Sequence, residues 1–100
     1  PYYFHVLFTV SSESVEDCLK ATTDIYQTLV ASVSDQTYII GPSPSPIERI
    51  KNKHRFQILL KYKREPKLLE VLTLLDKKYT DLYKKTGLSL KIDVDPQFIM

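Results

Sequence analysis

Hydrophobic periodicity switches repeatedly between two values along this chain, and that switching constrains the fold more than any other feature. A period of two, typical of a strand with one buried face, occurs over residues 4–10, 55–62 and 88–94. A period of three to four, typical of an amphipathic helix, occurs over residues 15–33 and 68–83. With a short β-rich run at 37–41, the predicted order is βαββαβ.

This order within 100 residues predicts a single α+β domain. Right-handed crossovers favour a split βαβ, ferredoxin-like sandwich with two helices on one face of a four-stranded sheet. The first and third strands would then be central, and the second sheet face would be open. We expect Tyr3, His5 and Leu7 on that open face, beside Arg55, Gln57, Leu59 and Lys61.

The helix ends have local signals. Ser12 stands where a helix N-cap belongs, ahead of an acidic first turn. Pro66 suits the first turn of the second helix, and Gly87 suits its C-cap. Cys18 lies on the buried stripe of the first helix, so we expect an inert core thiol.

Residues that the chain lacks exclude several enzyme classes. Two glycines, Gly41 and Gly87, are too few for a Walker loop or a dinucleotide-binding turn. One cysteine permits no internal disulfide and indicates a reducing compartment. No Cys/His metal-ligand spacing or Ser/His/Asp arrangement occurs, and Asp93 and Asp95 are interpreted as structural acids. We therefore expect no catalytic residue, metal or cofactor in this chain.

The first residues bear on the chain's context. Residues 2–10 are apolar, but they lack a basic flank and are too short to span a bilayer, so they predict a strand and no membrane partner. The chain opens on Pro1, and we expect residues 1–100 to be one domain from a larger multidomain protein.

Charge is distributed unevenly. Residues 1–48 hold one basic residue against six acidic ones, whereas residues 49–100 hold thirteen against six. This asymmetry indicates a polyanionic partner for the second half. For the helix lysines at 77, 78, 84 and 85, simple solubilisation is the competing interpretation.

Residues 41–55 combine stiffness with positive charge. The run GPSPSP removes amide donors and predicts an extended loop, which a basic cluster follows. Such cations can neutralise phosphates, and His54 with Phe56 can stack on unpaired bases; the alternative is a solvated hairpin arm. The candidate nucleic-acid-binding residues are Arg49, Lys51, Lys53, His54, Arg55 and Lys61.

Two motifs in this chain resemble the C-terminal domain family of primosomal protein N′, the bacterial PriA replication-restart helicases. One is a Gly-Pro-x-Pro-Ala-Pro-[Ile/Leu] run followed by a basic segment and an Arg-aromatic-Gln-[Ile/Leu]-Leu strand; the other is Asp-Val-Asp-Pro near the end. Ser45 replaces the usual alanine. The matching residues are Gly41, Pro42, Pro44, Pro46, Ile47, Arg55, Phe56, Gln57, Ile58, Leu59, Asp93, Val94, Asp95 and Pro96.

The resemblance implies a fold similar to a ribosomal small-subunit protein and a parent enzyme that is an ATP-dependent 3′-5′ DNA helicase. ATP, Mg and Zn would act in the parent outside this chain, which is not expected to be an enzyme itself. The implied partners are single-stranded and forked DNA, the remaining helicase domains and the acidic tail of single-stranded DNA-binding protein. For that tail the candidates are Lys63, Arg64 and Lys67. The implied location is the bacterial cytoplasm, associated with the nucleoid.

Two functions therefore compete at the level of sequence. The first is a DNA-binding accessory domain of a helicase that restarts stalled replication forks and assembles the primosome. The second is a protein-docking domain that braces the helicase core and binds the acidic tail. A metabolite-binding regulatory domain lacks support, because no glycine-rich effector loop occurs.

Overall fold

The computed structural model describes residues 3–50 and 52–95, the side chains of 46–50 excepted. Within them it has β1 (Phe4–Ser12), α1 (Val15–Ser32), β2 (Tyr38–Ile50), β3 (Lys53–Tyr62), α2 (Leu68–Thr86) and β4 (Ser89–Val94). The strands form one antiparallel sheet in the order β2-β3-β1-β4. This is the predicted ferredoxin-like arrangement, with β1 and β3 in the centre.

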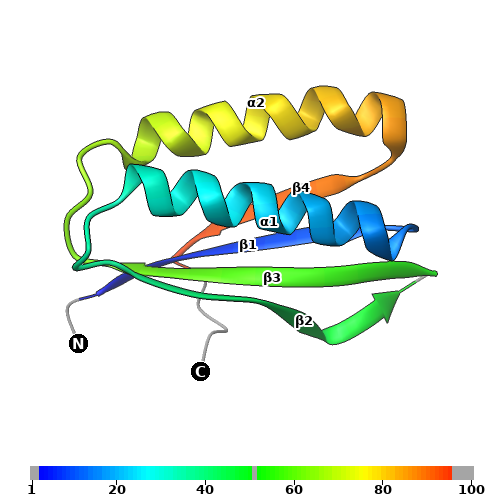
Figure 1. The fold of residues 1–100 in the computed structure, drawn as a ribbon, viewed down its shortest axis with the longest axis horizontal. Helices are drawn as coiled ribbons and strands as arrows, with labels where there is room; N and C mark the ends of the chain where they lie inside the picture. The colour runs from blue at the N-terminus through cyan, green and yellow to red at the C-terminus, as the bar shows by residue number, and fades with distance from the viewer. Residues whose placement is uncertain (1–2, 51, 96–100) are drawn as a thin grey trace.

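Both helices cover the same face of the sheet, so the described part of the molecule has two layers (Figure 1). The core lies between those layers. In β1 it takes Val6, Phe8 and Val10, all with no exposed surface, and in β3 it takes their cross-strand neighbours Leu60 and Ile58. Strand alternation therefore leaves the odd-numbered residues of β1 and β3 on the face opposite the helices, here called the open face.

The second half of β2 corrects a prediction. The loop expected over residues 41–55 is instead strand through Ile50, and β3 begins at Lys53. A proline-rich strand can form because β2 is an edge strand, where a residue without an N–H can face solvent. The pairing with β3 is nevertheless irregular, with register shifts between Ile40 and Ser43 and between Pro44 and Arg49, and β2 bends there (Figure 1).

The start of α1 also differs from the prediction. Its N-cap is Ser14, whose hydroxyl accepts a hydrogen bond from the Asp17 amide at 3.2 Å. Ser12 cannot take that role because it is still in β1, paired with His54. At the end of α2 the prediction is confirmed: Gly87 adopts φ 77°, and its amide donates to the Tyr83 carbonyl at 2.9 Å.

Each helix buries one stripe of residues. In α2 the buried positions are Leu68, Val71, Leu75 and Tyr79, whereas the neighbouring Leu69 is 75% exposed. It lies about 100° around the helix from Leu68, beyond the reach of the sheet. Among the described residues, neither helix carries an apolar stretch that could span a bilayer.

A polar contact joins the two helices. The Asp24 carboxylate accepts hydrogen bonds from Lys78 Nζ at 2.8 Å and from the Tyr79 hydroxyl at 2.6 Å. These bonds lower the pKa of Asp24. Burial, together with the hydrogen bond to Asp24, raises the pKa of Tyr79. The contact ties α1 to α2 above the sheet and leaves the open face unaffected.

Candidate nucleic-acid interface

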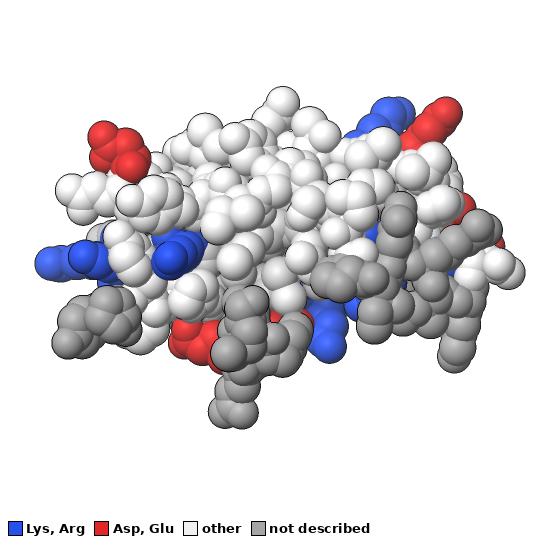
Figure 2. Space-filling view, turned by 90° about the horizontal axis from the view of Figure 1, so that it is seen from below, with Lys and Arg blue, Asp and Glu red and all other residues white. Residues whose placement is uncertain are grey.

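The open face is built of cross-strand rows, because antiparallel partners point to the same side. Figure 2 looks onto this face and shows mostly uncharged atoms over its middle, with basic and acidic side chains at its two ends and along one edge. From one end to the other, the rows are Tyr38–Lys61–His5, Ile40–Leu59–Leu7–Asp93, Ser43–Gln57–Thr9–Lys91 and Arg55–Ser11–Ser89. The predicted neighbourhood of Tyr3, His5 and Leu7 with β3 is confirmed.

The structure places the predicted cations in two separate groups. Lys53 and Arg55 lie half-buried at the start of β3, whereas Lys61 lies near its end. Lys61 is six residue steps along the strand from Arg55, which is about 20 Å. A ligand that contacts both groups must therefore extend along β3.

Strand alternation also divides the predicted cluster between the two faces. His54 lies on the helix side, where its carbonyl accepts a hydrogen bond from the buried Cys18 thiol at 3.7 Å. The backbone of Arg49 pairs with His54. The side chain of Arg49 and the whole of Lys51 lie outside the described residues. Within the described part of the chain, His54 therefore does not share a surface with Lys53 and Arg55.

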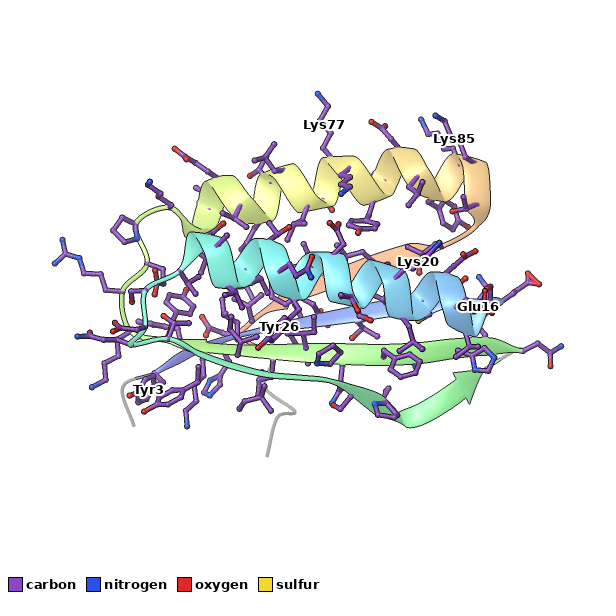
Figure 3. All side chains as sticks on the ribbon, in the orientation of Figure 1. Tyr3, Glu16, Lys20, Tyr26, Lys77 and Lys85 are labelled. Atoms are coloured by element: carbon purple, nitrogen blue, oxygen red, sulfur yellow. The ribbon has the colours of Figure 1, made fainter. Side chains whose placement is uncertain are left out.

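Aromatic and basic side chains meet at the end of β3 where Lys61 lies. The Nζ atoms of Lys61 and Lys63 lie 5.1 and 4.9 Å from the centroid of the Tyr3 ring, close enough for cation–π attraction. The Tyr38 ring packs beside Tyr3 with centroids 5.9 Å apart. Figure 3 shows Tyr3 below the sheet, on the side away from both helices. We call Tyr3, Tyr38, Lys61 and Lys63 the Tyr3 cluster.

Part of this cluster was not predicted from sequence. Alternation placed Tyr3 and Lys61 on the open face, but Lys63 was assigned to a different, protein-docking site. Tyr38 belonged only to a short β-rich run with no assigned partner. Tyr38 could have been identified only by predicting that β2 pairs with β3, because that pairing places Tyr38 opposite Lys61.

The segment between β3 and α2 carries the candidates for protein docking. The Glu65 carboxylate anchors it to the α1–β2 connection by accepting bonds from the Ser34 amide and hydroxyl, at 3.1 and 2.9 Å, and from the Thr37 hydroxyl. Burial opposes ionisation, but these hydrogen bonds prevail and lower the pKa of Glu65. Arg64 and Lys67 are exposed on either side of this anchor.

The open face also carries acidic groups with protein partners. Asp93 lies 3.9 Å from Lys91 Nζ, and the Asp95 carboxylate accepts a hydrogen bond from the His5 amide at 2.9 Å. Both fit the prediction of structural acids. Across residues 3–50 and 52–95, no three His, Cys, Asp or Glu side chains gather as a metal site.

The lysines of α2 lie on the other side of the molecule. Figure 3 shows Lys77 and Lys85 pointing away from the sheet, and Lys78 is bound to Asp24. Solubilising and structural roles account for these positions. Because these lysines carry the same charge but lie far from the open face, they are suitable control positions for variants of that face.

Comparison with known proteins identifies the family. A de novo designed protein with a ferredoxin fold superimposes with a TM-score of 0.55 at 10% identity, covering 99% of this chain and 89% of that one. Replication restart protein PriA of Bacillus subtilis (strain 168) is 36% identical over all 100 residues, and that of Haemophilus influenzae is 27% identical over 97% of the chain. The chain spans only 12% and 13% of those two relatives. The model for the primosomal protein N C-terminal domain matches residues 1–97, and the chain belongs to that family.

Proposed function

We propose that this chain is the DNA-binding accessory domain of an ATP-dependent 3′-5′ DNA helicase that restarts stalled replication forks and assembles the primosome. Its ligands would be single-stranded and branched DNA. The observation that carries the proposal is the placement of Lys53, Arg55, Lys61 and Lys63 along β3 and its extension, toward the face that the described helices leave uncovered. The names of the relatives, replication restart proteins, support the same role.

The spacing of these cations suits an extended polyanion. A strand lying along β3 would meet the Arg55 group and the Lys61 group at positions about 20 Å apart. Neutralising phosphates at both ends releases counterions, so binding would weaken steeply with salt. In the row between the two groups, Gln57 is partly exposed and can contact whatever lies over the middle of the sheet, whereas its partner Thr9 is buried.

The test is a titration of the 100-residue chain against labelled single-stranded and forked DNA at several salt concentrations, followed by anisotropy. The double variant Arg55→Gln with Lys61→Gln should weaken binding and reduce the salt slope by about one to two. The matched control, Lys77→Gln with Lys85→Gln, removes the same charge from the opposite side and should keep the wild-type affinity and salt slope. If both double variants lowered the affinity and the salt slope equally, binding would depend on net charge alone, which would contradict the proposal.

A second candidate function is protein docking. One observation favours it: within the described part of the chain, the α2 N-cap residue Lys67 makes no side-chain capping bond, and its neighbourhood includes the exposed Arg64. A helix N-terminus with adjacent cations suits a carboxylate, such as the acidic tail of single-stranded DNA-binding protein. Binding of an acidic tail peptide that Arg64→Gln abolishes, with no binding of DNA at low salt, would select docking over DNA binding.

A further inference from the structure

The Tyr3 cluster combines two features that a flat basic patch lacks. Tyr38 is 56% exposed although it is aromatic, and Ile40, two residues further along β2 in the adjacent row, is 52% exposed. Beside them stand two ammonium groups, those of Lys61 and Lys63, held over the Tyr3 ring. An apolar, aromatic surface next to paired cations fits a ligand that is flat and apolar at one end and anionic at the other.

We propose that the Tyr3 cluster is a binding site for one unpaired nucleotide, with the base stacked on Tyr38 and its phosphate between Lys61 and Lys63. The inference rests on the proposed DNA-binding function and deepens it, because it assigns the recognition of single strands to named residues. Stacking on an aromatic ring is tolerant of sequence, since every base has a π-face. The site would therefore select strand state and not sequence.

The position of the cluster supports an unpaired base. In a duplex the faces of the bases are covered by their neighbours, so a tyrosine reaches them only where the strand is single. Tyr38 lies at the start of the edge strand β2, at the rim of the sheet. A base can approach the ring there without lying under the rest of the DNA strand.

Charge gives the strand a direction of approach. Asp95 is held by the His5 amide on the β1 and β4 side of the cluster. A phosphate is repelled from that side and attracted toward Lys61 and Lys63. The nucleotide therefore sits over β2 and β3, and the rest of the strand continues along β3 toward Arg55.

The experiment compares three oligonucleotides of equal length: oligothymidine, a strand in which every residue is abasic, and a blunt duplex. Each is titrated with the wild-type chain and with Tyr38→Ala, Tyr38→Phe and Tyr83→Ala. Tyr83 is the matched control, because it is a tyrosine 51% exposed on α2. The chain contains no tryptophan, so Tyr38→Trp adds a unique reporter whose fluorescence a stacked base quenches.

The expected result is specific to bases. Tyr38→Ala should weaken binding of oligothymidine on the order of tenfold with little change in the salt slope, because stacking and not charge is removed. The same variant should leave abasic and duplex binding within about twofold, and Tyr38→Phe should retain most of the affinity. Tyr83→Ala should behave as the wild type. The indole fluorescence of Tyr38→Trp should fall with oligothymidine and stay constant with the abasic strand.

Two results would overturn the inference in distinguishable ways. If the wild-type chain binds oligothymidine and Tyr38→Ala binds it equally well, or loses the same factor on the abasic strand, the nucleotide site is wrong while the proposed DNA-binding function stands. If the wild-type chain binds no DNA at low salt, both proposals fail together. Circular dichroism of each variant separates loss of binding from loss of fold.

Discussion

Gly41 offers the sharpest test of how β2 is built. It adopts φ 111°, a conformation that side chains other than glycine rarely take. A Cβ added there would lie 2.7 Å from the Gln57 carbonyl oxygen and 3.2 Å from the Ser43 amide nitrogen. Both are backbone atoms, so neither can rotate away. Gly41→Ala must therefore move β2 away from β3 or change its backbone.

The size of the effect follows from a comparison with Gly87. Gly87 has φ 77° and open space around its Cβ position, so Gly87→Ala costs only the positive-φ strain, about 1–2 kcal/mol, less about 0.4–1 kcal/mol gained from the stiffer unfolded chain. Gly41→Ala adds the displacement of a central strand's carbonyl, with one or two ladder hydrogen bonds weakened at about 1 kcal/mol each. We expect about 3 kcal/mol for Gly41→Ala and about 1 kcal/mol for Gly87→Ala.

Thermal and urea unfolding followed by circular dichroism measure both variants. With about 4–8 °C per kcal/mol for a domain of this size, Gly41→Ala should melt about 15 °C below the wild type and Gly87→Ala about 5 °C below it. Equal losses at the two positions would show that the contact with Gln57 does not constrain β2. A smaller loss at Gly41 would refute the described path of that strand.

Three further outcomes are expected. Asp24→Asn should lower the free energy of unfolding by about 1 kcal/mol at pH 7, because two partly exposed hydrogen bonds weaken. The folded pKa of Asp24 lies below its ordinary 3.8, so this advantage of the wild type should vanish as the pH falls through that lower value. Urea unfolding at several pH values measures it. Glu65→Gln should lower the free energy of unfolding by about 1 kcal/mol. Thr37→Val should cost less in the Glu65→Gln variant than in the wild type, as a double-mutant cycle will measure. The Cys18 thiol, whose pKa burial raises, should react with Ellman's reagent on the order of a hundredfold more slowly in the folded chain than in urea; rapid reaction in the native state would contradict its burial.

The fold could be predicted because its information is local. Alternation in β1 separates Val6, Phe8 and Val10 from the residues of the open face, whatever the strand later pairs with. The C-cap at Gly87 is local in the same sense. Two predictions were wrong: Ser12 as the N-cap and a loop at 41–55. Both depended on where a strand ends, and pairing with β3 extends both β1 and β2.

The candidate site was predictable only in part. Charge in the sequence marks Lys53, Arg55 and Lys61 as candidates. Their division into two groups follows from the length of β3, and His54 is separated from them because it lies on the other face of the sheet. The contact of Tyr3 with Tyr38 joins residues 35 positions apart through two intervening pairings, β1 with β3 and β3 with β2. Nothing in the neighbourhood of either tyrosine in the sequence encodes that contact.

The sequence by itself determined the order of strands and helices, the face on which each strand residue lies and the surplus of cations in the second half. These properties follow from covalent geometry, which repeats every two residues in a strand and every 3.6 in a helix. Only the tertiary structure decided which residues became neighbours across the sheet. Register depends on pairing between distant segments, where a slip of one residue exchanges the two faces. The Tyr3 cluster, and the nucleotide site inferred from it, exist because that register places Tyr38 opposite Lys61.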